Sequence, residues 1–370
     1  MLLIKTQISM CRFVFVLLMC INTPVAAPLF SGEVGIGGEV FGRMEVTSGQ
    51  AEYDRRITHE YDREGRRLES AEYGPGGIMM QWNVFIYDDK GRLTGDRQYG
   101  PGGVLQEEQL MCYNPSGMLT EHLSLGADKD TISRLVYTYD ESMKLSRWSS
   151  YRQGGKPEWT RVYTYNSRGD RVAEKWYGPG RDLINHLVFE YDGWGNMTGQ
   201  SVYGPGQELQ WRYVYEYDEQ GRRTAVKWYR ADGRLDWVRT YRYDQDGNRV
   251  GERRYNAYRR LFSREVRYRM MYRFVFAYDS DGNQVDEKAF DRNGRLMWNR
   301  VYRYDTGGRL TDYIWYGPDG QIELRYANTY CRGGHRTAWT WYDGDGNLEW
   351  QRRYAYDGNG LLTEEIWRIP

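Results

Sequence analysis

The 370-residue chain has few cysteines and few histidines, and each shortage excludes a class of protein. Two of its four cysteines lie in an N-terminal apolar segment, and the other two, Cys112 and Cys331, are far apart, so we expect no disulfide framework. The four histidines are scattered, which predicts neither a metal cluster nor a nucleophile–base pair. We therefore expect no enzyme, no metal site and no cofactor.

Neither sign of charge dominates, because 51 basic residues balance 51 acidic ones. A chain with this balance is not expected to bind nucleic acid. Lysine is scarce, with only eight residues, so 43 of the basic residues are arginine. Arginine stacks flat on aromatic rings and binds carboxylates through two hydrogen bonds, and the chain supplies 34 tyrosines and 14 tryptophans as partners.

Long apolar runs are also lacking, apart from residues 13–21, which are too few for a comfortable membrane span. Basic residues precede this run and small residues follow it, which is the order of a secretory signal peptide. We predict a signal peptide at 1–27, a glycine-rich lead-in at 28–50, and a secreted, periplasmic or cell-surface protein without a transmembrane span. A retained N-terminal anchor is the competing interpretation, and residues 17–20 weakly resemble a lipoprotein acylation box.

What the chain has in abundance is a repeat marked by tyrosine. Twelve tyrosines recur every 26 residues, except for one interval of 35, and nine of them are followed by Asp. These leading tyrosines are Tyr61, Tyr87, Tyr113, Tyr139, Tyr165, Tyr191, Tyr217, Tyr243, Tyr278, Tyr304, Tyr330 and Tyr356. A fixed period of this length predicts a repeat architecture, which we expect to be one array over residues 51–370.

Each unit of the repeat predicts two strands and two turns. Glycine follows the leading tyrosine by four residues in eleven units, with Met143 as the exception, and Asp or Asn usually opens the turn. This pattern favours a type I turn that closes a hairpin. A second aromatic residue and a second turn, such as Gly74–Gly77, complete most units. We therefore predict an all-β fold of about 12 tandem β-hairpin repeats in a curved or spiralling antiparallel sheet.

The strand that leads into each tyrosine alternates, so that Arg161, Tyr163 and Tyr165 point to one side of the sheet. Repeats in register place equivalent side chains next to one another, which predicts ladders of aromatic rings and guanidinium groups. Two strands per unit would span about 115 Å if the sheet were flat, at about 4.8 Å per strand. Twist makes such a wide sheet coil or close, and we expect the aromatic face to turn inward.

The pattern Tyr-Asp-x-x-Gly-Arg/Asn, as in Tyr61–Arg66, Tyr217–Arg222 and Tyr278–Asn283, resembles the YD-repeat or Rhs family of bacterial secreted and cell-surface proteins. The resemblance implies strand-turn-strand units that wind into a spiral sheet, which in large members forms a shell around a toxic C-terminal cargo. This chain has far fewer repeats than we expect a closed shell to need, and because it ends within a repeat at 367–370 we expect no cargo domain. The resemblance therefore implies a surface or envelope binding scaffold, with a component of an Rhs-type toxin shell or delivery system as the alternative.

The interval of 35 residues adds a nine-residue basic insertion within 256–273. Insertions in repeat proteins form loops or longer hairpins and are frequent binding sites. The arginines of this region are candidates for binding an anionic polymer, a phosphate-bearing glycan or a lipid headgroup. They are Arg259, Arg260, Arg264, Arg267, Arg269 and Arg273. The plainer interpretation is a longer hairpin whose arginines pair with carboxylates of adjacent strands.

Tryptophan recurs at one repeat position, eleven residues after the leading tyrosine, and the candidates there are Trp176, Trp228, Trp315 and Trp341. Exposed tryptophans beside Asp and Arg are typical of sugar-binding surfaces, whereas buried ones would be core. The expected function is a secreted or envelope-associated scaffold that binds a glycan, a cell-wall polymer or a surface protein. An enzyme acting on polysaccharide is a weaker alternative, and the oligomeric state is left open.

Three turns, such as Asp343–Asn347, place oxygen-bearing residues at alternate positions with a glycine, as calcium loops do. The ligand set of a calcium loop is incomplete in all three. Turn-favouring composition explains them without a metal, so no calcium site is predicted.

Overall fold

The computed structural model describes residues 53–152, 155–259 and 265–369. The predicted signal peptide at 1–27 and lead-in at 28–50 lie outside these residues. The described part forms 24 β-strands and two short 3-10 helices, η1 (Pro75–Gly77) and η2 (Pro101–Gly103).

Odd-numbered strands lead into the repeating tyrosines. They are β1 (Arg55–Tyr61), β3 (Met79–Tyr87), β5 (Leu105–Tyr113), β7 (Thr131–Tyr139), β9 (Pro157–Tyr165), β11 (Leu183–Tyr191), β13 (Leu209–Tyr217), β15 (Leu235–Tyr243), β17 (Val266–Tyr278), β19 (Leu296–Tyr304), β21 (Ile322–Tyr330) and β23 (Leu348–Tyr356). The even-numbered return strands are β2 (Arg67–Tyr73), β4 (Leu93–Tyr99), β6 (Leu119–Gly126), β8 (Leu145–Tyr151), β10 (Arg171–Tyr177), β12 (Met197–Tyr203), β14 (Arg223–Arg230), β16 (Arg249–Arg259), β18 (Gln284–Asp291), β20 (Leu310–Tyr316), β22 (Arg336–Asp343) and β24 (Leu362–Arg368).

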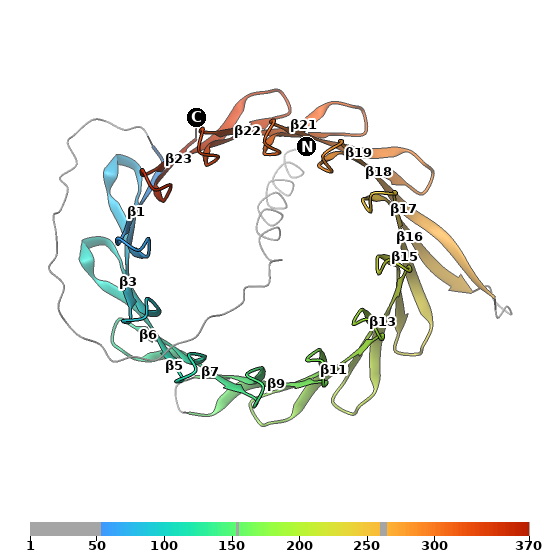
Figure 1. Ribbon diagram of the computed structural model, residues 1–370, viewed down its shortest axis with the longest axis horizontal. Helices are drawn as coiled ribbons and strands as arrows, with labels where there is room; N and C mark the ends of the chain where they lie inside the picture. The colour runs from blue at the N-terminus through green and yellow to red at the C-terminus, as the bar shows by residue number, and fades with distance from the viewer. Residues whose placement is uncertain (1–52, 153–154, 260–264, 370) are drawn as a thin grey trace, which may run out of the picture.

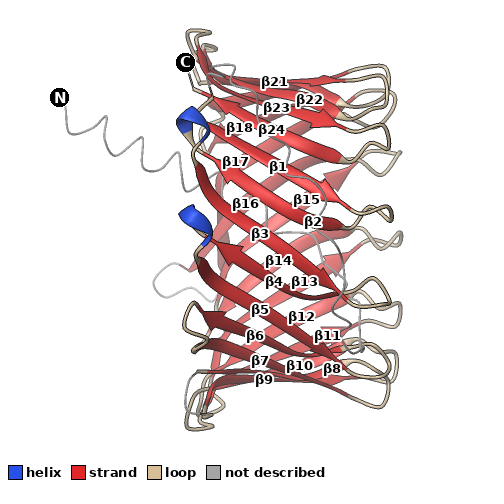
Figure 2. Cartoon of the chain, turned by 90° about the vertical axis from the view of Figure 1, so that its left-hand side faces the viewer, coloured by secondary structure: helices blue, strands red, loops and turns tan. Residues whose placement is uncertain are grey.

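Consecutive strands pair antiparallel, and the sheet closes because β1 also pairs with β24. Figures 1 and 2 show the resulting ring of strands. The predicted all-β array of hairpin repeats is confirmed, but the sheet is a closed barrel and not an open spiral. Twelve repeats are therefore enough to close it, contrary to the expectation from the sequence, and closure removes two edges whose backbone groups would otherwise be unpaired.

The curvature has a local cause that recurs in every repeat. The register between consecutive strands shifts next to the leading tyrosine, as between Glu216 and Tyr217, and again next to the second aromatic residue, as between Trp228 and Tyr229. Such β-bulges bend the strand and increase its twist. Because eleven of the twelve repeats carry two of them and the last carries one, the bend accumulates until the two edges meet.

The turns after the leading tyrosines have the predicted chemistry. In the first repeat the carboxylate of Asp62 accepts the backbone N–H groups of Glu64 (3.0 Å) and Arg66 (2.9 Å), and Gly65 has a φ of 80°. The residue at the glycine position takes a positive φ in all twelve turns, including Met143 at 61°. These turns form one rim of the barrel, called here the tyrosine rim; η1 and η2 lie on the other rim (Figure 2).

The hydroxyl group of every leading tyrosine joins its repeat to the repeat before it. Each hydroxyl donates to a backbone carbonyl at the start of the preceding return strand, at distances from 2.6 to 3.1 Å. Tyr217, for example, donates to the carbonyl of Met197 (2.8 Å). Tyr61 donates to the carbonyl of Leu362 (2.9 Å), so the same bond links the first repeat to the last. The tyrosine hydroxyl therefore fastens neighbouring repeats, a role that the sequence did not predict.

The two faces of the sheet differ in how well they are covered. The residue directly before the leading tyrosine is exposed in eleven of twelve odd-numbered strands, whereas the residue two positions before it is exposed in none. Side chains converge on the inside of a closed sheet and diverge on the outside, so the covered set lines the lumen. This inner face carries most of the tryptophan and many of the tyrosine and arginine residues of the strands, and its aromatic character agrees with the sequence prediction.

Candidate functional site

The inner face is the surface that closure of the sheet encloses. Barrels of about 16 strands already leave a channel that side chains do not fill, so 24 strands enclose a wider lumen. Two stretches of this face have contrasting chemistry, and they are defined below as the aromatic arc and the polar arc.

The aromatic arc lies on β19–β24 and consists of inward-facing rings that are joined by ring contacts or, for Trp298 and Trp315, by a shared guanidinium group. Its members are Trp298, Tyr302, Tyr313, Trp315, Tyr326, Trp339, Trp341, Trp350 and Trp367. Tyr313 and Tyr326 stack with centroids 4.6 Å apart and planes 10° apart, and Trp350 stacks on Trp341 and Trp367, both at 5.8 Å. Ring pairs in this geometry stabilise the sheet beyond the area they bury.

Arginine and glutamate complete the aromatic arc. The guanidinium of Arg300 lies 4.2 Å from the ring centroid of Trp298 and 5.5 Å from that of Trp315, and it pairs with Glu287 at 3.3 Å. The hydroxyl of Tyr302 donates to the same carboxylate (3.0 Å). Burial, followed by the negative charge of Glu287, raises the pKa of Tyr302 well above its ordinary value, so the hydroxyl stays protonated and keeps donating.

The polar arc lies on β3–β6, where the same inward positions carry amides, a hydroxyl, carboxylates and an imidazole. Its members are Gln81, Asn83, Asp96, Glu107, Gln109, His122 and Ser124. The imidazole Nε2 of His122 lies 2.7 Å from Oε1 of Gln109, and Nε2 of Gln109 donates to the hydroxyl of Ser124 (3.3 Å). Ser124 in turn donates to Glu107 (2.7 Å). One connected hydrogen-bond network therefore joins His122, Gln109, Ser124 and Glu107.

One carboxyl group of the polar arc, that of Asp96, lies where burial disfavours its charged form. Burial raises the pKa of Asp96, the positive charge of His122 opposes this shift, and the negative charge of Glu107 adds to it. The side-chain N–H groups of Gln109 are engaged by Glu107 and Ser124, whereas the amide and carboxylate oxygens keep lone pairs that can accept the hydroxyl groups of a polar ligand. The sequence contains a signal for this arc, because the aromatic ladder is interrupted here.

The first and last strands of the sheet meet at the seam between β1 and β24, where four residue pairs are in register. His59, almost fully buried, places Nε2 3.4 Å from Oε1 of Glu365, which also pairs with Arg352. Burial, together with the positive charges of Arg67 and Arg352, lowers the pKa of His59 to about 4. His59 is therefore neutral at pH 7 and titrates only in acid.

The predicted basic insertion forms an extension of the hairpin β16–β17, called here the arm, which projects outside the ring in Figure 1. Of the six candidate arginines, Arg260 and Arg264 lie outside the described residues. Arg259 ends β16, where it pairs with Val266. The prediction of a longer hairpin agrees with these bounds.

The remaining candidate arginines of the arm do not share one face. Arg267 lies opposite Tyr258 in the register, and the guanidinium of Arg269 lies 5.8 Å from the ring centroid of Tyr258. Arg273 lies opposite Arg253, five positions before Tyr258 on the same strand, so it faces the other way. Binding of an anion by Arg267 and Arg269 stays a prediction.

All four candidate tryptophans lie on the inner face and are half-buried in the ladder. The ring of Trp228 stacks on Trp237 at 6.3 Å, and that of Trp341 on Trp350 at 5.8 Å. The guanidinium of Arg161 lies 5.1 Å from the ring centroid of Trp176. That of Arg300 lies 5.5 Å from the ring centroid of Trp315. Neighbours therefore occupy faces of these rings, which is the arrangement of a structural ladder, and direct contact with a ligand stays a prediction.

One exposed aromatic residue was missed by the sequence reasoning. Trp194 lies in the turn between β11 and β12 on the tyrosine rim and is 91% exposed. The sequence carried a usable signal, because a tryptophan at the third position after a leading tyrosine occurs in this repeat alone. Aligning the repeats by their strand residues does not single out this turn position.

Other candidate features of the sequence have simple structural roles. Cys112 and Cys331 are free thiols. In the turn that resembles a calcium loop at 343–347, Oδ1 of Asp343 accepts the N–H of Asn347 at 2.8 Å, as in the other turns. Within residues 53–152, 155–259 and 265–369, no group of His, Cys, Asp and Glu is arranged to hold a metal ion. Across the same ranges, no helix has both the length and the apolar character needed to cross a membrane.

No family model matches this chain, and no curated protein sequence matches it. Among solved structures it is similar to the Photorhabdus luminescens Tc holotoxin pore with the mutation TccC3-D651A, at 16% identity and a TM-score of 0.35, covering 83% of this chain and 19% of that chain. The crystal structure of TcdB2-TccC3 gives 16% identity and a TM-score of 0.36, covering 86% and 21%. This chain therefore spans about a fifth of those chains, and similarity at this level carries no argument about function.

Proposed function

We propose that this protein is a secreted or envelope-associated scaffold that binds a carbohydrate polymer against the inner face of its barrel. The observation that supports this most directly is the polar arc, a half-buried hydrogen-bond network on an enclosed surface that elsewhere carries many stacked rings and guanidinium groups. The proposal includes no catalytic step and no cofactor.

The chemistry of the polar arc fits a sugar better than an apolar or strongly charged ligand. Gln109 and Glu107 present planar groups with two heteroatoms each, which match pairs of adjacent hydroxyl groups. Their side chains are already held by His122 and Ser124, so binding would cost little side-chain entropy. The neighbouring aromatic surface favours a ligand that has both polar and apolar faces, as pyranose rings do.

A glycan array tests the proposal, followed by affinity measurements with the polysaccharide that binds. We expect Gln109→Ala to weaken binding about tenfold, a loss of about 1.4 kcal/mol. The matched control is Gln210→Ala, because Gln210 is exposed on a strand of the same barrel and outside the polar arc. The absence of binding to any polysaccharide or peptidoglycan, together with co-purification of a protein partner, would overturn the proposal.

Closure of the sheet favours a second candidate function, a shell component that encloses a polypeptide guest. A closed ring with a wide lumen has the geometry for this role. The distinguishing measurement is limited proteolysis of the protein purified from its native source. A co-purifying protein that resists cleavage until the barrel is unfolded would favour the shell over the glycan scaffold.

A further inference from the structure

The turn between β11 and β12 exposes an aromatic side chain that no packing role explains. Trp194 is 91% exposed, whereas the next most exposed large apolar side chains of the described residues reach 66%. The equivalent turn position carries a polar residue or glycine in every other repeat. The other eleven turns form without an aromatic side chain at this position, so the exposed indole is not needed to build the turn.

The backbone beneath Trp194 is held firmly by its own turn. The carboxylate of Asp192 accepts the N–H groups of Trp194 (2.9 Å) and Asn196 (2.8 Å), and the side-chain amide of Asn196 donates to it as well (2.9 Å). Hydrogen bonds from Asn196 lower the pKa of Asp192, so this cap persists in mild acid. The turn therefore fixes the position of the Trp194 backbone, although the indole ring itself contacts solvent.

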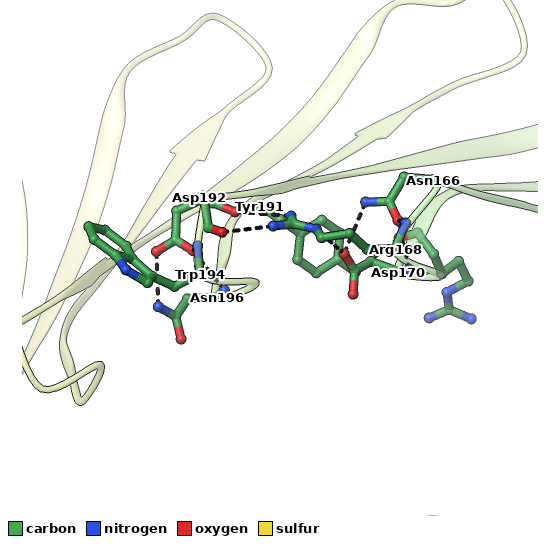
Figure 3. Close-up of polar contacts among 9 residues, drawn as sticks. Asn166, Arg168, Asp170, Tyr191, Asp192, Trp194 and Asn196 are labelled. Carbon is green, nitrogen blue, oxygen red and sulfur yellow. Dashed lines mark hydrogen bonds and ion pairs between the residues drawn. The ribbon is translucent and has the colours of Figure 1, made fainter.

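The preceding repeat adds a second support to the same turn. Arg168 donates to the carbonyl of Gly193 (3.0 Å) and to that of Asp192 (3.0 Å), and its Nε pairs with Asp170 (3.2 Å). Figure 3 shows Arg168 reaching across to this turn while the indole of Trp194 points away from the cluster. A fixed backbone with a free ring is the arrangement of a pre-organised binding contact.

The surroundings of Trp194 are too polar for a protein-docking patch. A specific protein interface covers about 800 Å² per partner, and one tryptophan supplies about 200 Å². Met143, the other exposed large apolar residue on the tyrosine rim, is four strands away, or about 19 Å at the usual strand spacing. A ligand that covers one ring and meets polar groups around it fits better, and a sugar ring has these properties.

We propose that Trp194 forms a sugar-binding subsite on the tyrosine rim, in which the indole stacks on a pyranose ring. Asn196, which lies two residues after Trp194 in the same turn and is partly exposed, is placed to bind its hydroxyl groups. The choice of a sugar as the ligand rests on the proposed function, whereas the location of the subsite on the tyrosine rim is a new assignment. The subsite differs from the inner tryptophans because both faces of its ring are free of neighbours.

Fluorine NMR of protein labelled with fluorotryptophan tests this subsite, with Trp194→Phe used to assign its resonance among the 14 tryptophans. The probes are cellohexaose and chitohexaose, whose flat chains suit stacking, and maltohexaose for comparison. We expect the Trp194 resonance to shift and saturate near about 1 mM hexasaccharide, and Trp194→Ala to weaken binding about tenfold. Met143→Ala is the control on the same rim and should leave binding unchanged.

The outcomes separate this subsite from the lumen site. A Trp194 resonance that no hexasaccharide moves overturns the subsite, and the proposed function still stands if Gln109→Ala weakens binding of the polymer. A Trp194 shift combined with no effect of Gln109→Ala supports the subsite and overturns binding in the lumen. Equal weakening by Trp194→Ala and Met143→Ala would overturn the stacking role, because only one of these side chains has a ring.

Discussion

The aromatic arc and the polar arc occupy the same repeat positions of one sheet, yet different forces hold them. On β19–β24 the inward side chains stack, and their contacts are mainly dispersion and ring electrostatics. On β3–β6 they form hydrogen bonds, as between Gln109, His122 and Ser124. The backbone scaffold therefore tolerates either chemistry at these positions, and the difference separates a stretch that stiffens the barrel from one suited to binding.

The largest expected effect comes from removing a ring at the centre of the aromatic arc. Trp350 contacts Trp339 at 4.7 Å and both Trp341 and Trp367 at 5.8 Å. We expect Trp350→Ala to lower the free energy of unfolding by about 3 kcal/mol, through lost ring contacts and the space left behind. Denaturant unfolding followed by circular dichroism measures this change. The control, Trp194→Ala, should change stability by less than about 0.5 kcal/mol; equal losses would show that the stacked arc adds no special stability.

The next largest effect is expected at the seam, where the end of the aromatic arc meets β1. The pKa of His59 is about 4 in the folded chain, below its ordinary value of 6.5, so the unfolded chain takes up the proton first as pH falls. Stability present above pH 6.5 should therefore be lost between pH 6.5 and 4, by up to about 3 kcal/mol. Urea midpoints across this range measure the loss. His59→Gln should remove most of the pH dependence, and an unchanged profile in that variant would contradict the assignment.

A smaller effect is expected from the tyrosine hydroxyl that fastens the seam. Tyr61→Phe removes the bond to the carbonyl of Leu362, and Tyr217→Phe removes the equivalent bond between repeats inside the array. Each should cost about 1 kcal/mol, the usual net value of one hydrogen bond. Only Tyr61 lies at a joint without a connecting turn, so Tyr61→Phe should also speed amide hydrogen exchange in β1. If both variants speed exchange equally in β1, the seam is no weaker than the other joints.

The smallest effect is expected in the polar arc. Gln109→Ala should lower stability by less than about 1 kcal/mol, because water can replace the lost partners of half-buried groups. Its effect on glycan binding should be much larger than its effect on unfolding. A loss as large as that of Trp350→Ala would mean that the polar arc is also structural, and the contrast between the arcs would disappear.

Much of the local fold could be predicted from the sequence, because its causes lie within a few residues. The cap by Asp62, the positive φ at Gly65 and the strands that end at each tyrosine follow from turn chemistry and alternation. The turn at Met143 was the apparent exception, yet it adopts the same conformation at a φ of 61°. The hairpin around it evidently outweighs the preference of that one residue.

The site was harder to predict, because its residues become neighbours only across strands. The sequence pointed to six arginines as one cluster, but Arg273 faces away from Arg267 and Arg269 once a bulge shifts the register. Regular spacing drew attention to the inner tryptophans, whereas the most exposed tryptophan, Trp194, breaks the pattern. Neither outcome could be read from spacing alone, since exposure depends on which neighbours the fold supplies.

The sequence by itself determined the repeat, the two strands of each unit and the chemistry of its turns, because these depend on interactions over short distances along the chain. Only the tertiary structure decided that twelve units close and that each tyrosine hydroxyl reaches the repeat before it. The reason is accumulation: each bulge adds a small bend, and only the sum over 24 strands brings Tyr61 to the carbonyl of Leu362, 301 residues away.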